Sequence, residues 1–292
     1  MQGAVNAVQS GLGFLQSGLL TGLHTITMGI AAPASLAAAE QPLSGAASSD
    51  ARAIRMVLLL RHGQAEHNPR YYNPLWILHT MLGRDTPLTP RGIEQAHEAR
   101  SCVEGFGWLP ILENIYVSPL QRTIHTASIA CVASQELRQP PLELCPLLAE
   151  RNLFICDTGS PVDVILSRTP YVAKGPWCGV DQLTGEWWPP AMEGDDQLMR
   201  RVSLLKKSLV DRPERIVGCV GHGAFFRALC GVKLPNAVPR WAALRTDGSV
   251  VLKPEWDALD ASSLLEISKQ LADVDERVQS QSQSAAPWNP IL

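Results

Sequence analysis

Short, continuous apolar runs, each ended by a glycine or polar residue, recur through the middle of this chain. The clearest is Met56-Val-Leu-Leu-Leu60, which leads directly into Arg61-His62-Gly63. A second run, residues 216–220, leads into Gly221-His222-Gly223. Runs of this length are typical of strands buried on both faces of a parallel sheet. Because ligands of open α/β sheets bind at the carboxyl ends of strands, the pattern predicts a site beside the two histidines.

Between these runs lie segments whose apolar residues recur at helical spacing or that begin with a helix-capping pattern. Thr89 before Pro90 predicts the start of a helix that runs to about Glu104. Ser118-Pro119-Leu120-Gln121 has the pattern of a capping box and predicts a helix with Arg122 in its first turn. Further helices are predicted over residues 198–209 and after His222, strands over residues 115–118 and 142–148, and a hairpin turn at Asp247-Gly248. Strands that alternate with helices predict a single α/β domain with a mostly parallel sheet.

Four segments lack this regularity. Residues 69–84 are expected to form an irregular insert, and residues 151–192 a loop-rich cap over the site. Residues 1–51, rich in Ala, Gly, Ser and Leu, are either a targeting segment or a disordered extension, and residues 267–292 form a polar tail that we expect to be disordered. The folded domain is therefore predicted to span residues 52–266.

Composition excludes several classes of protein. The net charge of -3 gives no electrostatic basis for binding nucleic acid, and the apolar stretch near the N-terminus is too polar for stable membrane insertion. The seven cysteines include no C-x-x-C pair, which argues against a zinc cluster or a disulfide framework and favours a reducing compartment. We expect a cytoplasmic protein, with plastid or other organelle targeting by residues 1–51 as the alternative. The sequence leaves the oligomeric state open.

The predicted strand ends and helix starts carry two arginines, two histidines and one carboxylate. Guanidinium groups match the geometry of a phosphoryl group. A neutral imidazole can attack phosphorus, and nearby cations keep it neutral. A carboxylate outside the phosphate pocket can protonate the leaving alcohol. This combination points to phosphoryl chemistry on a small phosphorylated substrate.

Five motifs occur in an order that resembles the histidine phosphatase superfamily, whose fold is like that of phosphoglycerate mutase. They are Arg61-His62-Gly63 with Asn68, Pro87-Leu-Thr-Pro-Arg-Gly92, Ser118-Pro-Leu-Gln-Arg122, Leu148-Ala-Glu150 and Val220-Gly-His222-Gly223. The resemblance covers roughly residues 54 to 232 and implies a three-layer α/β/α sandwich. Any one motif is weak evidence, whereas five in order are specific.

The resemblance implies a role for each motif residue. His62 would be the nucleophile that becomes phosphohistidine. The phosphate pocket would consist of Arg61, Asn68, Arg122, His222 and Gly223. Glu150 would be the proton donor, with Asp157 as an alternative acid. No metal or other cofactor would be needed, and the remaining histidines, among them His67, are expected to be surface or packing residues.

Two alternatives to a hydrolase remain. A phosphoglycerate-type mutase would return the phosphoryl group to an alcohol, but Ala65 stands where mutases carry Ser or Thr. A non-catalytic scaffold of the same fold would be expected to have lost at least one site residue. The sequence therefore favours a phosphatase, with a peptide-directed phosphatase as a further possibility and the substrate undetermined.

Overall fold

The computed structural model describes residues 55–68, 75–134 and 137–284. All of them belong to one compact unit, residues 35–292; the other unit, residues 1–34, lies outside the described residues, as does the whole of the predicted segment 1–51. The strands are β1 (Arg55–Arg61), β2 (Asn114–Val117), β3 (Leu142–Leu144), β4 (Trp177–Cys178), β5 (Ile216–Gly221), β6 (Arg240–Leu244) and β7 (Val250–Leu252). The α-helices are α2 (Trp76–Leu82), α3 (Pro90–Gly105), α4 (Gln121–Ala130), α5 (Val162–Arg168), α6 (Asp195–Asp211), α7 (Gly223–Cys230) and α8 (Ala261–Ser284).

These strands form one seven-stranded sheet in the order β4-β3-β2-β5-β1-β6-β7. The first five strands of that order pair with their neighbours in parallel, whereas β6 pairs antiparallel with both β1 and β7. The mostly parallel sheet predicted from the sequence is therefore confirmed, as is the β6–β7 hairpin. In its turn, Ser249 N–H donates to Asp247 Oδ1 at 2.7 Å, and Gly248 has a φ of 80°, which favours glycine.

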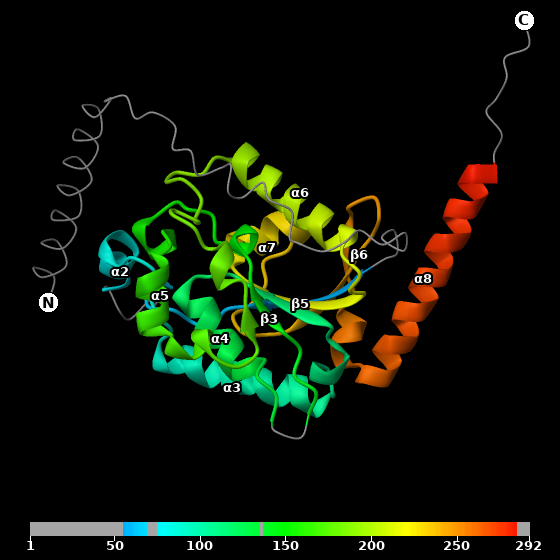
Figure 1. Ribbon diagram of the computed structural model, residues 1–292, viewed down its shortest axis with the longest axis horizontal. Helices are drawn as coiled ribbons and strands as arrows, with labels where there is room; N and C mark the ends of the chain where they lie inside the picture. The colour runs from blue at the N-terminus through cyan, green and yellow to red at the C-terminus, as the bar shows by residue number, and fades with distance from the viewer. Residues whose placement is uncertain (1–54, 69–74, 135–136, 285–292) are drawn as a thin grey trace, which may run out of the picture. The chain divides into compact units, whose positions relative to one another are not determined.

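Helices cover both faces of the sheet (Figure 1). Successive side chains of β1 point to opposite faces. Met56, Leu58 and Leu60 belong to the core that includes residues of α3 and α4, whereas Val57 and Leu59 pack in the core that includes residues of α6 and α7. Burial on both faces is the reason that β1 is a continuous apolar run.

Three segments differ from the sequence-based expectations. The insert at 69–84 contains α2; residues 69–74 lie outside the described part of the chain. The cap at 151–192 is more regular than expected, because it contains α5 and the edge strand β4. The predicted disordered tail is wrong up to Ser284, which ends α8. Leu264 is buried, and Ile267 and Leu271 pack on the same core, so helical apolar spacing continues beyond residue 266.

The described part of the chain contains no helix of the length and apolarity needed to cross a membrane.

Candidate active site

The ends of β1 and β5 bring the two predicted histidines together. Arg61 pairs with Gly221 in the parallel register, and His62 N–H donates to Gly221 O at 3.0 Å. The His62 and His222 rings follow directly, with centroids 5.1 Å apart. The two histidines that the sequence places at strand ends therefore lie side by side.

His62 is held as a neutral imidazole. Its Nδ1 lies 2.6 Å from Gly63 O, so the tautomer protonated at Nδ1 donates to that carbonyl and leaves the lone pair on Nε2. Burial lowers the pKa of His62 well below its ordinary value, and Arg122 and Arg61 lower it further. A buried, neutral ring nitrogen beside two guanidinium groups is suited to attack on phosphorus.

Glycines permit the close approaches around His62. A Cβ atom on Gly63 would lie 2.3 Å from Gly92 O, which no side chain tolerates. This contact joins the Arg-His-Gly turn to the start of α3, where Thr89 Oγ1 caps Gly92 N–H at 3.1 Å. The motif at residues 87–92 therefore positions the loop that carries the nucleophile.

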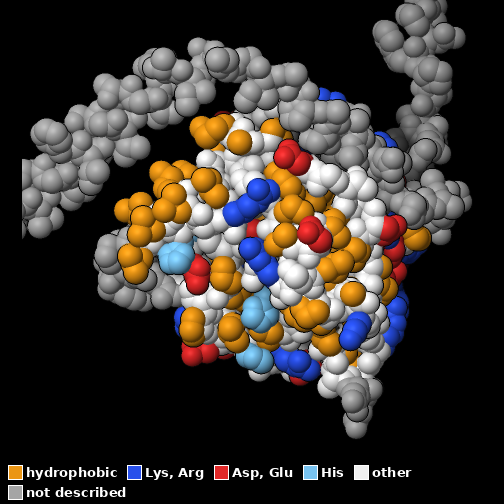
Figure 2. All heavy atoms as spheres, turned by 60° about the vertical axis from the view of Figure 1, so that its left-hand side comes forward, with side chains coloured by type: hydrophobic (Ala, Val, Ile, Leu, Met, Phe, Trp, Pro, Cys, Tyr) orange, Lys and Arg blue, Asp and Glu red, His pale blue; other side chains and the backbone are white. Residues whose placement is uncertain are grey.

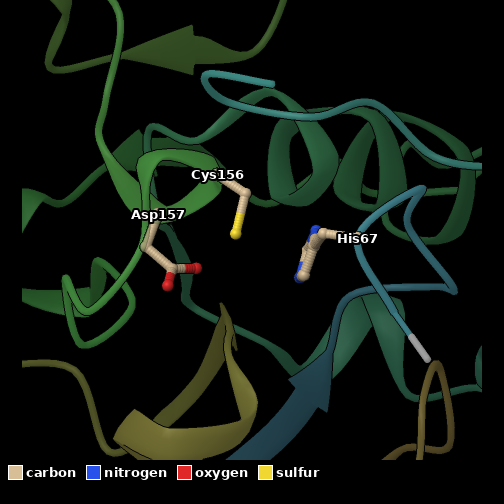
Figure 3. Close-up of side chains that lie close together, drawn as sticks. All are labelled: His67, Cys156 and Asp157. Atoms are coloured by element: carbon tan, nitrogen blue, oxygen red, sulfur yellow. The ribbon is translucent and has the colours of Figure 1, made fainter. Parts of the chain in front are cut away.

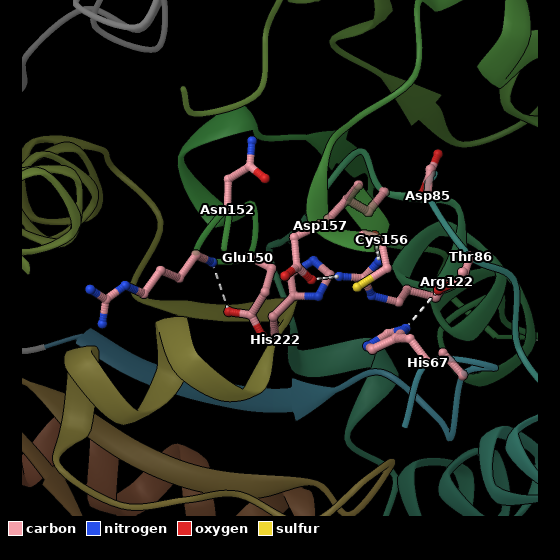
Figure 4. Close-up of polar contacts among 12 residues, drawn as sticks. His67, Asp85, Thr86, Arg122, Glu150, Asn152, Cys156, Asp157 and His222 are labelled. Atoms are coloured by element: carbon pink, nitrogen blue, oxygen red, sulfur yellow. Dashed lines mark hydrogen bonds and ion pairs between the residues drawn. The ribbon is translucent and has the colours of Figure 1, made fainter. Parts of the chain in front are cut away.

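Arg122 lies in the first turn of α4 and is fully buried. It donates from Nη1 to Cys156 O at 2.9 Å and from Nη2 to Asp157 Oδ1 at 3.1 Å (Figure 4). The predicted cap at Ser118 is wrong, because α4 begins at Gln121. Ser118 Oγ instead lies 2.8 Å from His222 Nε2, and Asp85 Oδ1 accepts from Gln121 N–H at 2.8 Å.

Three buried nitrogens of the predicted phosphate pocket have no hydrogen-bond partner among the residues that the structure describes. They are Arg61 Nε, Arg122 Nε and His222 Nδ1. Buried polar atoms without a partner are rare in folded proteins and call for an explanation. An anion bound between these side chains would provide acceptors for them.

A cavity of about 380 Å³ opens beside this group. Its lining includes Arg61, His62, Asn68, Glu150 and Gly223, so five of the predicted site residues share one cavity. The buried side chains of Arg122 and His222 are not part of that lining. Asn68 lies in the wall, where its Oδ1 accepts from Ala65 N–H at 2.8 Å.

Glu150 follows β3 after a short 3-10 helix, η3 (Pro146–Leu148), and faces the N-terminus of α7. Its Oε2 accepts from Ala224 N–H at 3.1 Å, and its Oε1 accepts from Phe225 N–H at 3.0 Å and from Arg151 N–H at 2.9 Å. A helix N-terminus favours a carboxylate through its free N–H groups. This arrangement fixes the orientation of Glu150 in the cavity wall.

Arg201 of α6 supports the chain segment that carries Glu150. Its Nη1 donates to the carbonyls of Leu147 and Ala149 at 2.8 and 2.6 Å. Its Nε and Nη2 donate to the carboxylate of Glu193 at 3.0 and 2.7 Å. Sequence reasoning missed this residue, although an arginine between apolar positions 198 and 205 on one helix face is the signal of a buried ion pair.

Three further residues of the cavity wall escaped the sequence analysis as a group: His67, Cys156 and Asp157. His67 was expected to be a surface or packing residue, but its ring centroid lies 6.0 Å from that of His62. Burial, followed by Arg122 and Arg61, lowers the pKa of His67 to about 2. Burial raises the pKa of Asp157 to about 6 and that of the Cys156 thiol to about 12. His67 is only five residues from His62 in the sequence, and this short separation was the signal that could have placed it near the site.

Two exposed cations, Arg227 and Lys233, also line the cavity. Figure 2 shows Lys and Arg side chains in a hollow of the face that carries α2, with hydrophobic side chains around them. Several apolar side chains on or beside α2 are about half exposed or more: Leu75, Ile77, Leu78, Met81 and Leu82. The entrance therefore combines positive charge with apolar surface.

Comparisons with known proteins identify relatives of this chain. Fructose-2,6-bisphosphatase TIGAR B from Danio rerio is 29% identical over 154 residues, which are 53% of this chain and 52% of the relative, so the chain matches about half of that protein. Solved structures with a similar fold include phosphoglycerate mutase from Bacillus anthracis (17% identity, 71% of this chain and 95% of that one, TM-score 0.43). Phosphoserine phosphatase from Entamoeba histolytica is another (18% identity, 68% of this chain and 95% of that one, TM-score 0.39).

The family model of branch 1 of the histidine phosphatase superfamily matches residues 57–257, a range that contains both histidines, Arg61, Arg122 and Glu150. Since the match covers more than half of the chain, this protein belongs to branch 1 of the histidine phosphatase superfamily.

Proposed function

We propose that the protein is a metal-independent phosphomonoesterase that hydrolyses small phosphorylated metabolites through a phosphohistidine at His62. The observation that carries this proposal is the state of the His62 ring. Its Nδ1 is tied to Gly63 O at 2.6 Å, its pKa is lowered, and its Nε2 keeps a lone pair beside Arg61.

The reaction would proceed in two steps. In the first, His62 Nε2 attacks phosphorus, the bond from phosphorus to the leaving oxygen breaks, and an acid gives that oxygen a proton. In the second, water attacks phosphorus, the bond between phosphorus and His62 Nε2 breaks and returns the lone pair to the ring, the conjugate base of that acid takes a proton from the water, and inorganic phosphate leaves. Arg61 and Arg122 would neutralise the charge that develops on the phosphoryl oxygens, and His222, whose pKa is lowered by burial and by Arg122, would donate a hydrogen bond to them.

Two carboxylates of the cavity wall are candidates for the acid. The motif resemblance favours Glu150, whose position is fixed by three backbone N–H groups. Asp157 has a pKa near 6, which suits proton donation near neutral pH, but Oδ1 is paired with Arg122. We propose Glu150 as the donor and keep Asp157 as the alternative.

The two exposed cations of the cavity lining indicate what kind of substrate could bind. Arg227 and Lys233 would favour an ester that carries a second anionic group at a distance from the scissile phosphate. The Danio rerio relative is named for a bisphosphate substrate. We therefore propose bisphosphates and phosphorylated carboxylic acids as the first substrates to screen.

The test is hydrolysis of p-nitrophenyl phosphate by the full chain in the presence of EDTA. Wild type should be active and His62→Ala inactive, whereas His97→Ala, which removes an exposed histidine of α3, should retain activity. Acid quenching of a slow ³²P-labelled substrate should not preserve the intermediate, but alkaline quenching should. Equal activity in wild type and His62→Ala would overturn the assignment.

A mutase is the second candidate, since the same intermediate could transfer its phosphoryl group to an alcohol. Chromatography of a phosphoglycerate after incubation distinguishes the two functions. Release of inorganic phosphate supports the phosphatase, and isomerisation without release supports the mutase.

A further inference from the structure

His67, Cys156 and Asp157 converge from two segments that are far apart in the sequence (Figure 3). His67 lies in the loop after β1, whereas Cys156 and Asp157 lie in the 3-10 helix η4 (Ile155–Asp157). One ligand atom from each residue can be chosen so that all three atoms lie within 4.8 Å of one another. An imidazole nitrogen, a thiolate and a carboxylate are the donors that Zn²⁺ and similar ions prefer.

We infer that His67, Cys156 and Asp157 bind a divalent transition-metal ion such as Zn²⁺ in the wall of the cavity, and that the bound ion inhibits the enzyme. Three protein ligands leave one position of a tetrahedral ion for water or an anion. The binding part of this inference stands independently of the proposed function, and the inhibition part rests on it.

The surroundings prepare His67 for this role. Its Nδ1 lies 2.6 Å from Thr86 Oγ1, a contact that fixes the ring and leaves Nε2 as the ligand atom. A hydrogen bond to the second ring nitrogen is the usual support of a metal-bound histidine. Asn68 Nδ2 contacts Nε2 at 3.4 Å, a long contact that a metal ion would replace.

The thiol is the group that must change its protonation state. Cys156 is 1% exposed and hydrogen-bonds to Asp157. Binding would replace the thiol proton by the metal ion: the S–H bond breaks, the proton passes to solvent, and a sulfur–metal bond forms. Because binding releases this proton, binding should strengthen as pH rises.

Two guanidinium groups oppose the ion. Arg122 is 3.1 Å from Asp157, and Arg61 lines the same cavity. They make the site weaker than a structural zinc site, which is expected of a site that regulates and releases its ion. Mg²⁺ should not bind, because it prefers oxygen ligands and an octahedral shell.

Inhibition is expected because the ion would link two segments of the cavity wall. It would tie η4 to the loop after β1, and so hold the Asp157 carboxylate against Arg122. A substrate phosphoryl group could then no longer replace Asp157 on that arginine. The ion would also occupy part of the cavity that contains His62.

The experiment uses the full chain in its reduced state with Co²⁺ as the spectroscopic probe and without substrate. We expect one equivalent of Co²⁺ to give a thiolate-to-cobalt charge-transfer band and the intense d–d bands of a four-coordinate ion, and Zn²⁺ to remove both. Cys156→Ala should lose the charge-transfer band, and Cys178→Ala, which removes an exposed cysteine of β4, should keep it. His67→Gln, which retains the thiol, should weaken Co²⁺ binding at least tenfold.

Absence of the band in wild type, or its persistence in Cys156→Ala, would overturn the site. In the activity arm, Zn²⁺ should inhibit hydrolysis of p-nitrophenyl phosphate, EDTA should reverse the inhibition, and Mg²⁺ should have no effect. Cobalt binding through Cys156 in a protein without phosphatase activity would leave the metal site standing and reject the proposed function. Binding through Cys156 without inhibition by Zn²⁺ would reject the inhibitory role.

Discussion

Asp157 occupies one terminal nitrogen of Arg122, with Oδ1 3.1 Å from Nη2 and both side chains at least nine-tenths buried. Arg122 is one of the residues that the sequence motifs assign to the phosphate pocket. A phosphoryl group that takes over this N–H must therefore displace a carboxylate. The pair makes phosphate binding depend on the charge of Asp157.

The first prediction concerns this competition. Above pH 6 Asp157 is ionised and holds Arg122, whereas below pH 6 it is protonated and competes less. Asp157→Asn should bind sulfate, whose charge is constant in this range, about tenfold more tightly than wild type at pH 7.5, a difference of ~1.4 kcal/mol. The difference should shrink below pH 5.5. Sulfate inhibition constants at the two pH values provide the measurement, and equal constants at pH 7.5 would show that the pair does not compete.

The second prediction separates the two candidate acids. An alkyl leaving group needs a proton, whereas p-nitrophenolate leaves without one. If Glu150 is the donor, Glu150→Gln should lower kcat/KM for an alkyl phosphate by ~10²–10⁴ and that for p-nitrophenyl phosphate much less. Asp157→Asn should not show this dependence on the leaving group. The reverse pattern would assign the proton to Asp157.

The third prediction concerns Gly223. A Cβ atom at this position would lie 3.1 Å from Nε and Cζ of Arg61, so alanine would shift the guanidinium. Gly223→Ala should lower kcat/KM by roughly tenfold or more, because small displacements of a positioning group are costly. Gly105→Ala is the matched control, since no atom lies within 4 Å of its added Cβ. Similar activities of the two variants would contradict the proposed importance of the Gly223–Arg61 contact.

The fourth prediction concerns Arg201. Arg201→Met leaves the buried Glu193 carboxylate without its partner, which should lower the free energy of unfolding by about 3–5 kcal/mol. It should also lower activity toward alkyl phosphates more than toward p-nitrophenyl phosphate, since Arg201 supports the segment of Glu150. Arg100→Met, which breaks the more exposed Arg100–Glu104 pair, should cost less than about 1 kcal/mol. Urea denaturation of both variants checks the stability, and similar losses would argue against the buried-pair interpretation.

Sequence patterns predicted the features of this fold that depend on local periodicity. Burial of both faces of β1 required an apolar run, and the apolar runs that end at His62 and at Gly221 are the strands β1 and β5. The Thr89 cap was predictable for the same reason, because its partner is three residues away.

Features that depend on distant partners were not predictable. Ser118 matches a cap but lies next to His222, 104 residues away. Arg201 bonds to carbonyls more than 50 residues earlier. His67 and Cys156 come together only because η4 folds over the loop after β1, and no spacing rule connects them. The apolar runs identified the strand ends, whereas the tertiary packing determines which polar groups meet there.

The last prediction concerns stability and pH. The pKa of Asp157 is about 6 in the folded protein and near 3.8 when unfolded. Between these values the folded state keeps a proton that the unfolded state has lost. The contribution of Asp157 to the free energy of unfolding is therefore largest below pH 3.8 and falls as pH rises to 6. Relative to Asp157→Asn, wild type should lose on the order of 2 kcal/mol between pH 4 and pH 7.

Chemical denaturation of both proteins at pH 4, 5, 6 and 7 measures this difference. Other titrating groups are common to the two proteins and cancel, and the ion pair with Arg122, which forms only when Asp157 is ionised, is already contained in the pKa of Asp157. A difference that is constant from pH 4 to pH 7 would show that Asp157 ionises normally in the fold. In that case Asp157 would hold Arg122 throughout this range, and sulfate binding would lose its dependence on pH as well.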